Sequence, residues 1–128
     1  MSVEVLAQLQ PENISQLREV YCLFPISIAW IGWLWKKLKD ERRERDGDPD
    51  ERLEVDHKHP RYKGGTDDEE NLQALTLPEH AMKHFRAHLA EKDKESRHNE
   101  ARATGAIVSR MTKEEYKEFM RRLKDEQK

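Results

Sequence analysis

Imidazole and carboxylate side chains are concentrated between residues 55 and 84, which hold four of the six histidines of this 128-residue chain. Asp56 and His57 are adjacent, whereas His80 and His84 are four residues apart, a spacing that places both imidazoles on one face of a helix. Two imidazoles and a nearby carboxylate can share one divalent cation, and three protein ligands leave coordination positions open for catalysis. The remaining histidine could act as a general base, since its ordinary pKa lies near neutrality.

A strand, a loop, a second strand and a helix are predicted to carry these residues. Residues 52–57 alternate polar and apolar side chains, which favours a short strand, and residues 72–77 suggest a second one. The adjacent Asp and His should point to opposite faces of the first strand unless it ends there. A Gly-Gly pair at 64–65 allows the loop between the strands to adopt positive φ without steric cost. Thr76 has the spacing of an N-cap for the helix that holds the paired histidines.

Helices are also predicted on both sides of this stretch. Residues 12–21 have apolar side chains at helical spacing, and a further helix should start near Ser27 and continue through a charge-mixed stretch to a Gly-Asp-Pro-Asp breaker. Thr112 is predicted to cap the last helix. Before it, residues 101–111 should form a short apolar packing segment that is broken at Gly105. These elements predict an α+β fold that is mostly helical.

The central stretch resembles the HNH, or ββα-metal, endonuclease family, and is most similar to phage- and intron-encoded members. The resemblance covers about residues 53–90. The residues that match the family pattern, besides the Asp-His pair, are Pro60, Gly64, Gly65, Asp67, Asp68, Asn71, Leu72, Leu75, Thr76, Glu79, His80, Ala81 and His84.

The resemblance implies a phosphodiester hydrolase with one divalent metal ion, which could be Mg²⁺, Mn²⁺, Ni²⁺ or Zn²⁺. His57 would be the general base that deprotonates the attacking water. Asp56 and His80 would hold the metal, with His84 as a further ligand, and Asn71 would organise the loop and orient the base.

The implied substrate is DNA, and Arg61 and Lys63 in the loop are candidate contacts with phosphate. The implied setting is the cytoplasm of a bacterial host or phage-infected cell, in a phage, mobile element or defence system. Two alternatives stay open: a catalytically silent HNH-like module that binds nucleic acid or protein in a larger assembly, and a membrane-associated nuclease effector. No reader of base edges is visible in the sequence.

Three parts are expected along the chain. These are a helical and apolar N-terminal segment with a packing or partner role over 1–50, the ββα-metal motif over 51–95, and a C-terminal helical extension over 96–128.

The run at residues 21–35 has no charged side chain and contains three tryptophans. A domain of this size has difficulty burying so much apolar surface, so we favour core packing together with a contact to a homodimer or protein partner. The run is short for a membrane span and is interrupted by Pro25. Contact with a lipid surface and a membrane span are the minor alternatives.

Composition limits the remaining possibilities. The net charge of −2 gives no global attraction to nucleic acid, so binding must come from a local patch. Many HNH proteins carry Cys-x-x-Cys pairs that bind a structural zinc, but Cys22 is the only cysteine here. The N-terminus lacks the basic start of a secretory signal, so no export is expected. His59 stands where the family commonly has an apolar residue, and its role is left open between a surface residue and a spare ligand.

Overall fold

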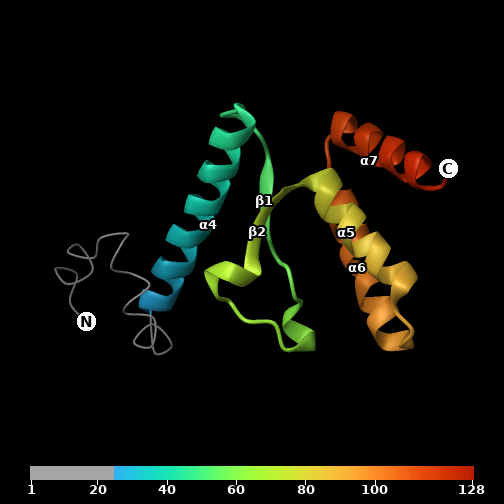
Figure 1. The fold of residues 1–128 in the computed structure, drawn as a ribbon, viewed down its shortest axis with the longest axis horizontal. Helices are drawn as coiled ribbons and strands as arrows, with labels where there is room; N and C mark the ends of the chain where they lie inside the picture. Colours follow the sequence, from blue (N-terminus) through green and yellow to red (C-terminus); the bar gives the residue numbers. More distant parts are fainter. Residues whose placement is uncertain (1–24) are drawn as a thin grey trace. The chain divides into compact units, whose positions relative to one another are not determined.

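The computed structural model describes residues 25–128, and the chain divides into two compact units at residue 50. The first unit contains α4 (Pro25–Asp46), and the second contains all the other elements. Figure 1 gives their order along the chain. The helix predicted at 12–21 and the start of the apolar run, residues 21–24, lie outside the described residues.

Helix α4 confirms the helix predicted through the charge-mixed stretch. It begins at Pro25, which suits a first helical position because the N–H that proline lacks would have no intrahelical partner there. Its polar half contains ion pairs between residues four apart, such as Lys36 and Asp40 at 2.6 Å. The helix ends just before Gly47, which adopts a φ of 70°. Among the described helices, none is long and apolar enough to cross a membrane.

The second unit begins with the predicted ββα arrangement. Strands β1 (Leu53–His57) and β2 (Leu72–Thr76) pair antiparallel, and α5 (Leu77–Ala90) follows β2 directly. The Thr76 side chain caps α5 by accepting a hydrogen bond from the Glu79 N–H. The register places His57 opposite Leu72, so the last residue of β1 faces the first residue of β2. The fold is therefore α+β and mostly helical, as predicted.

Two more helices complete this unit, and one of them corrects the sequence analysis. Helix α6 (Lys94–Ser109) runs without interruption through Gly105, where a break was predicted. A glycine inside a helix costs only about 1 kcal/mol. The Asp93 side chain caps α6 at its start, and Ile107 in its last turn is buried. We attribute the continuity of the helix to these two contacts. Helix α7 (Lys113–Glu126) begins with the predicted Thr112 cap, and the complete capping box is formed.

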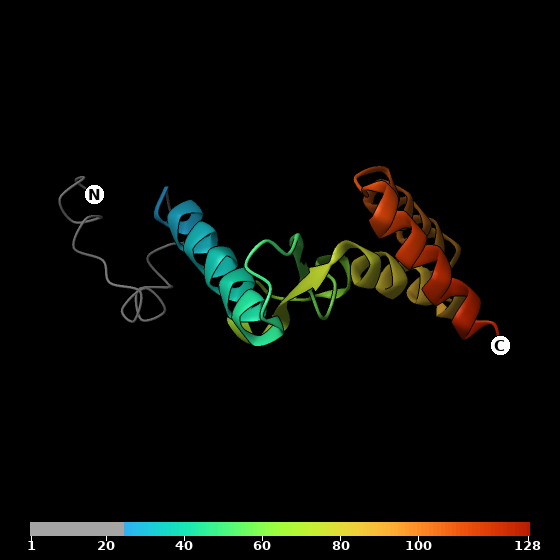
Figure 2. The ribbon, with the colours of Figure 1, turned by 90° about the horizontal axis from the view of Figure 1, so that it is seen from above.

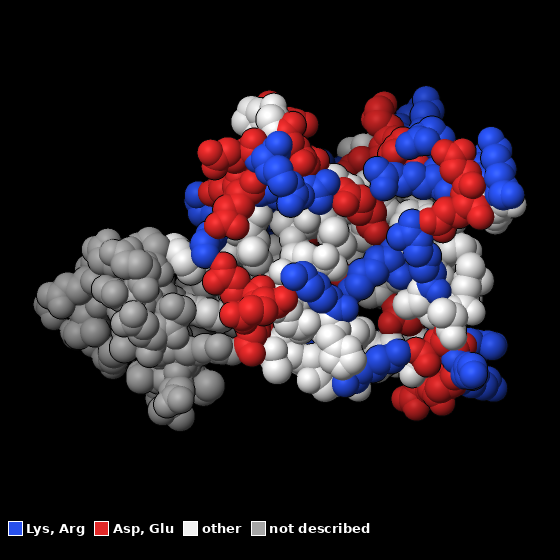
Figure 3. All heavy atoms as spheres, viewed as in Figure 1, with Lys and Arg blue, Asp and Glu red and all other residues white. Residues whose placement is uncertain are grey.

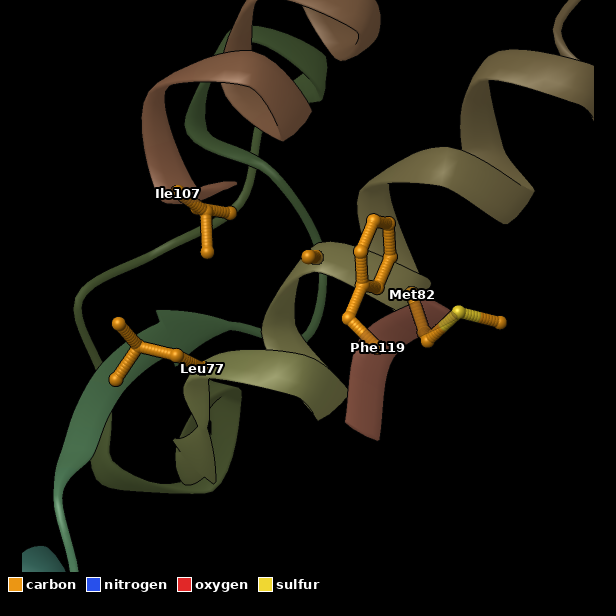
Figure 4. Close-up of a cluster of buried hydrophobic side chains, with 5 residues drawn as sticks. Leu77, Met82, Ile107 and Phe119 are labelled. Carbon is orange, nitrogen blue, oxygen red and sulfur yellow. The ribbon is translucent and has the colours of Figure 1, made fainter. Parts of the chain in front are cut away.

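A small hydrophobic core joins the three C-terminal helices. Helices α5 and α6 lie side by side, and α7 crosses α5 obliquely (Figures 1 and 2). Figure 4 shows the side chains that converge between them. They are Leu77, Ala81 and Met82 from α5, Ile107 from α6 and Phe119 from α7. This core therefore holds α5, the helix that carries the paired histidines, against α6.

The loop between the strands contains two 3-10 turns, at Arg61–Lys63 and Glu69–Asn71. Its two glycines serve different purposes. Gly64 ends the first turn with a φ of 90°, which L residues rarely adopt. Gly65 has ordinary φ but lies against the chain itself, and a Cβ there would come within 1.8 Å of the His59 carbonyl oxygen. The expectation of positive φ is therefore met at one glycine only, and the other permits a close backbone approach.

Replacing Gly65 with alanine should lower the free energy of unfolding by more than about 2 kcal/mol, because the opposing atom is backbone and the loop must move. Gly64→Ala is the matched control, since a Cβ there meets open space and only the φ is unfavourable, at about 1–2 kcal/mol. Urea unfolding of both variants tests this. Equal midpoints for the two variants would contradict the close-approach explanation.

Candidate metal centre

Strand alternation directs two carboxylates toward α5. Glu54 and Asp56 are two residues apart on β1 and therefore share a face of the strand. Both reach histidines of α5: a Glu54 oxygen lies 2.8 Å from His80 Nδ1, and an Asp56 oxygen lies 3.4 Å from His80 Nε2. This β1–α5 contact forms the centre of the site.

Three side chains present donor atoms to one point. Asp56 Oδ1 lies 3.4 Å from His80 Nε2 and 3.7 Å from His84 Nε2, and the two Nε2 atoms are 3.2 Å apart. Metal–nitrogen bonds of the length typical for zinc imply ligand atoms about 3.3 Å apart in a tetrahedral site. The three donors thus fit one divalent cation. Among the described residues, they form a group of side chains that could hold a metal ion.

A carboxylate contacts the Nδ1 atom of each of the two histidines. His80 Nδ1 lies 2.8 Å from Glu54 Oε2, and His84 Nδ1 lies 2.5 Å from Glu100 Oε2. A carboxylate at Nδ1 accepts a hydrogen bond from the ring N–H and directs Nε2 toward the metal position, which is the usual arrangement around metal-binding histidines. The histidine pair is therefore oriented for coordination through both Nε2 atoms.

Local electrostatics favour an ionised carboxylate at the centre. Burial opposes ionisation of Asp56, but hydrogen bonds from His80, His84 and Lys83 outweigh it and hold the pKa of this carboxyl far below its usual range. Burial also lowers the pKa of His84, yet its hydrogen bonds with Asp56 and Glu100 raise that pKa overall. A cation that binds here must therefore displace a proton that His84 holds more firmly than an ordinary histidine does.

His57 opens onto the same side of the site. A pocket of about 250 Å³ is lined by Asp56 and His57 from β1, by His84 from α5 and by Glu100 from α6. Both neighbours on β1 line this pocket, and His57 is the last residue of the strand. His57 Nε2 lies 2.7 Å from Asp67 Oδ1. The ring is thus held by the loop at one nitrogen, next to the donor group.

Asn71 ties the loop together through its side chain. Its Oδ1 accepts a hydrogen bond from the His59 N–H, and its Nδ2 donates to the carbonyls of His59 and Thr66. The His57 ring instead forms its direct hydrogen bond with the Asp67 carboxylate, which accepts it. The His59 ring lies 2.8 Å from the Lys63 carbonyl, and His59 does not belong to the group of three donors among the described residues.

The two loop cations predicted to contact phosphate occupy different places. Arg61 lines the pocket and pairs with Asp67, the carboxylate that also holds His57. Lys63 pairs with Glu91 just beyond α5 and is not among the residues that line this pocket. Figure 3 shows lysine and arginine interleaved with acidic side chains over the visible face of the second unit, so no large surface of one sign is seen there.

Four polar residues of the site were not assigned a role from the sequence: Glu54, Asp67, Lys83 and Glu100. Glu54 could have been found by strand alternation from Asp56. Lys83 precedes His84 on α5, and its ammonium donates to Asp56 and to the His57 carbonyl. Asp67 stands among the residues that match the family pattern, but its contact with His57 depends on the loop, and Glu100 reaches the site from α6, where no local signal places it.

Comparison with known families identifies the class of this site. The model of the HNH endonuclease family matches residues 37–86, a segment that includes β1, the loop, β2 and most of α5. The ββα arrangement and the donor group lie within the segment that matches the HNH endonuclease domain. The function class is that of a nuclease-type domain. Comparisons with curated proteins and with solved structures found no match.

Proposed function

We propose that this chain is a metal-dependent endonuclease that hydrolyses DNA phosphodiester bonds. The observation that carries the proposal is a group of three converged donors, two of which, Asp56 and His84, line one pocket together with a separate histidine, His57. Asp56, His80 and His84 would hold the cation, and His57 would accept the proton of the attacking water. The phage or intron-encoded subtype and a cytoplasmic setting remain parts of the proposal.

His57 is suited to proton transfer by the way its ring is held. The Asp67 carboxylate accepts the Nε2–H, which leaves Nδ1 as the basic nitrogen. Among the described residues, Nδ1 forms no hydrogen bond, so it can accept a proton from water. Asp67 is itself ionised and fixed, because hydrogen bonds from Arg61 and His57 outweigh burial and lower its pKa. Asn71 supports this arrangement by holding the loop.

A divalent cation in this site would polarise the scissile phosphate and stabilise the negative charge that develops on the leaving oxygen. The donor set is rich in imidazole nitrogen, which suits Zn²⁺ and Ni²⁺, whereas Mg²⁺ prefers oxygen ligands. We therefore expect tighter binding of Zn²⁺ or Ni²⁺ than of Mg²⁺, with Mn²⁺ between them. Which metal supports turnover is a separate question that cleavage assays answer.

Contacts with the substrate and with a partner are also part of the proposal. Arg61 at the pocket could exchange its pair with Asp67 for a phosphate oxygen, and Lys63 could do so at the other end of the loop. A homodimer or protein partner that covers residues 21–35 is proposed because Trp35 leaves 41% of its surface exposed. The organisation into parts 1–50, 51–95 and 96–128 likewise remains a proposal.

Cleavage of supercoiled plasmid by the purified chain tests the function. Nicked or linear product should appear with at least one of Mn²⁺, Mg²⁺, Ni²⁺ and Zn²⁺, and EDTA should abolish it. His98→Ala, which replaces an exposed histidine on α6, should cleave like the wild type. Absence of cleavage with every metal, by protein that unfolds cooperatively and retains DNA binding, would contradict the proposal and favour a silent binding module.

A further inference from the structure

Glu100 is a buried carboxylate that comes from outside the matched HNH segment. It lies in the middle of α6, leaves only 2% of its surface exposed and contacts two residues of the site. Its Oε2 lies 2.5 Å from His84 Nδ1, and its Oε1 accepts a hydrogen bond of 2.6 Å from the Tyr62 hydroxyl. Both carboxylate oxygens are therefore used, one by a candidate metal ligand and one by the loop that holds His57.

The partners of Glu100, His84 and Tyr62, indicate that this carboxylate serves the site and does not only stabilise the fold. A buried carboxylate is costly unless other groups compensate its charge, and arginine or lysine usually does so. Among the described residues, neither type forms an ion pair with Glu100, which is compensated by His84 and Tyr62. The burial of this charge is thus tied to the orientation of a site histidine.

A neutral side chain of the same shape would not orient His84 in the same way. The ionised carboxylate can only accept a hydrogen bond, so it selects the tautomer with the proton on Nδ1 and the lone pair on Nε2. An amide could accept from Nδ1–H or donate to a bare Nδ1. The selection of the ligating tautomer would then be lost.

We propose that Glu100 is a positioning residue of the metal site, so that α6 completes a site that the segment 37–86 does not contain by itself. The proposal rests on the proposed metal-dependent function. A second contact from the end of α6 agrees with it: Arg110, the C-cap residue, donates to Glu54, the carboxylate behind His80. The carboxylate at His84 Nδ1 thus belongs to a residue beyond the matched segment, and the carboxylate at His80 Nδ1 is bound by one.

Titration of the full-length chain with Mn²⁺ and with Zn²⁺, followed by calorimetry, tests this without any activity readout. Glu100→Gln should weaken metal binding by about 10- to 100-fold. Glu95→Gln changes an exposed glutamate on the same helix and should keep wild-type affinity. Thermal unfolding of the metal-free variants should remain cooperative, so that the loss of affinity is separated from loss of fold.

Tyr62→Phe provides a second, milder variant that removes only the hydroxyl of an exposed loop residue. It should weaken metal binding severalfold, and it decides the matter if Glu100→Gln does not fold. If Glu100→Gln folds and binds metal with wild-type affinity, the inference is overturned while the proposed function stays intact. If Glu100→Gln does not fold, wild-type affinity of Tyr62→Phe has the same meaning. Failure of the wild type to bind any divalent metal would overturn both.

Discussion

Replacing His57 with alanine should lower the rate of DNA cleavage by about 10²- to 10⁴-fold, the range expected for loss of a general base. Metal affinity should stay close to that of the wild type. The physical reason is that His57 lines the pocket but lies outside the group of three donors. Its only hydrogen-bonded ring contact among the described residues is Asp67, so the substitution leaves the metal ligands and their supporting carboxylates in place.

Two measurements on the same preparation separate the roles. Single-turnover cleavage of a labelled duplex gives the rate, and calorimetric titration with Mn²⁺ gives the affinity. His98→Ala controls for the loss of an exposed imidazole. A His57→Ala variant that no longer binds metal would assign His57 as a ligand instead. A variant that cleaves at the wild-type rate would show that another group removes the proton.

Replacing Asp56 with asparagine should weaken metal binding by at least about 100-fold and reduce cleavage to the level seen with EDTA. Asp56 is the only charged donor in the group of three, and an amide oxygen is a poorer ligand for a transition metal. The substitution preserves the size of a side chain that leaves only 8% of its surface exposed, so little repacking is required. It also leaves Lys83 without its carboxylate partner, which adds an unfavourable positive charge near the cation.

Thermal unfolding gives an independent readout of the same change. A metal present at 100 times its dissociation constant stabilises the wild type by about 2.7 kcal/mol, and this increment should fall to about 0.4 kcal/mol or less in Asp56→Asn. Asp125→Asn on α7 is the matched control, because its carboxylate is exposed and contacts only surface cations. An unchanged metal-induced stabilisation in Asp56→Asn would place the cation elsewhere.

Local chemistry made the ββα order and the position of the last helix predictable, and the family resemblance pointed to Asp56 as the carboxylate beside the two histidines. The caps at Thr76 and Thr112 and the break at Gly47 depend on a few neighbouring residues, and each is found where the sequence placed it. The spacing of His80 and His84 likewise needs only helical geometry to bring two imidazoles together. Where the prediction depended on one residue alone, at Gly105, tertiary packing overrode it.

The support of the site was decided only by the tertiary structure. Glu100 reaches His84 because the core of α5 and α6 sets these helices side by side, and Asp67 reaches His57 because the Asn71 hydrogen bonds close the loop. These contacts join residues that are far apart in the chain, and their formation depends on packing, which no local pattern encodes. The sequence by itself therefore determined which groups could do the chemistry, whereas packing determined which carboxylates hold them in the orientation that the chemistry requires.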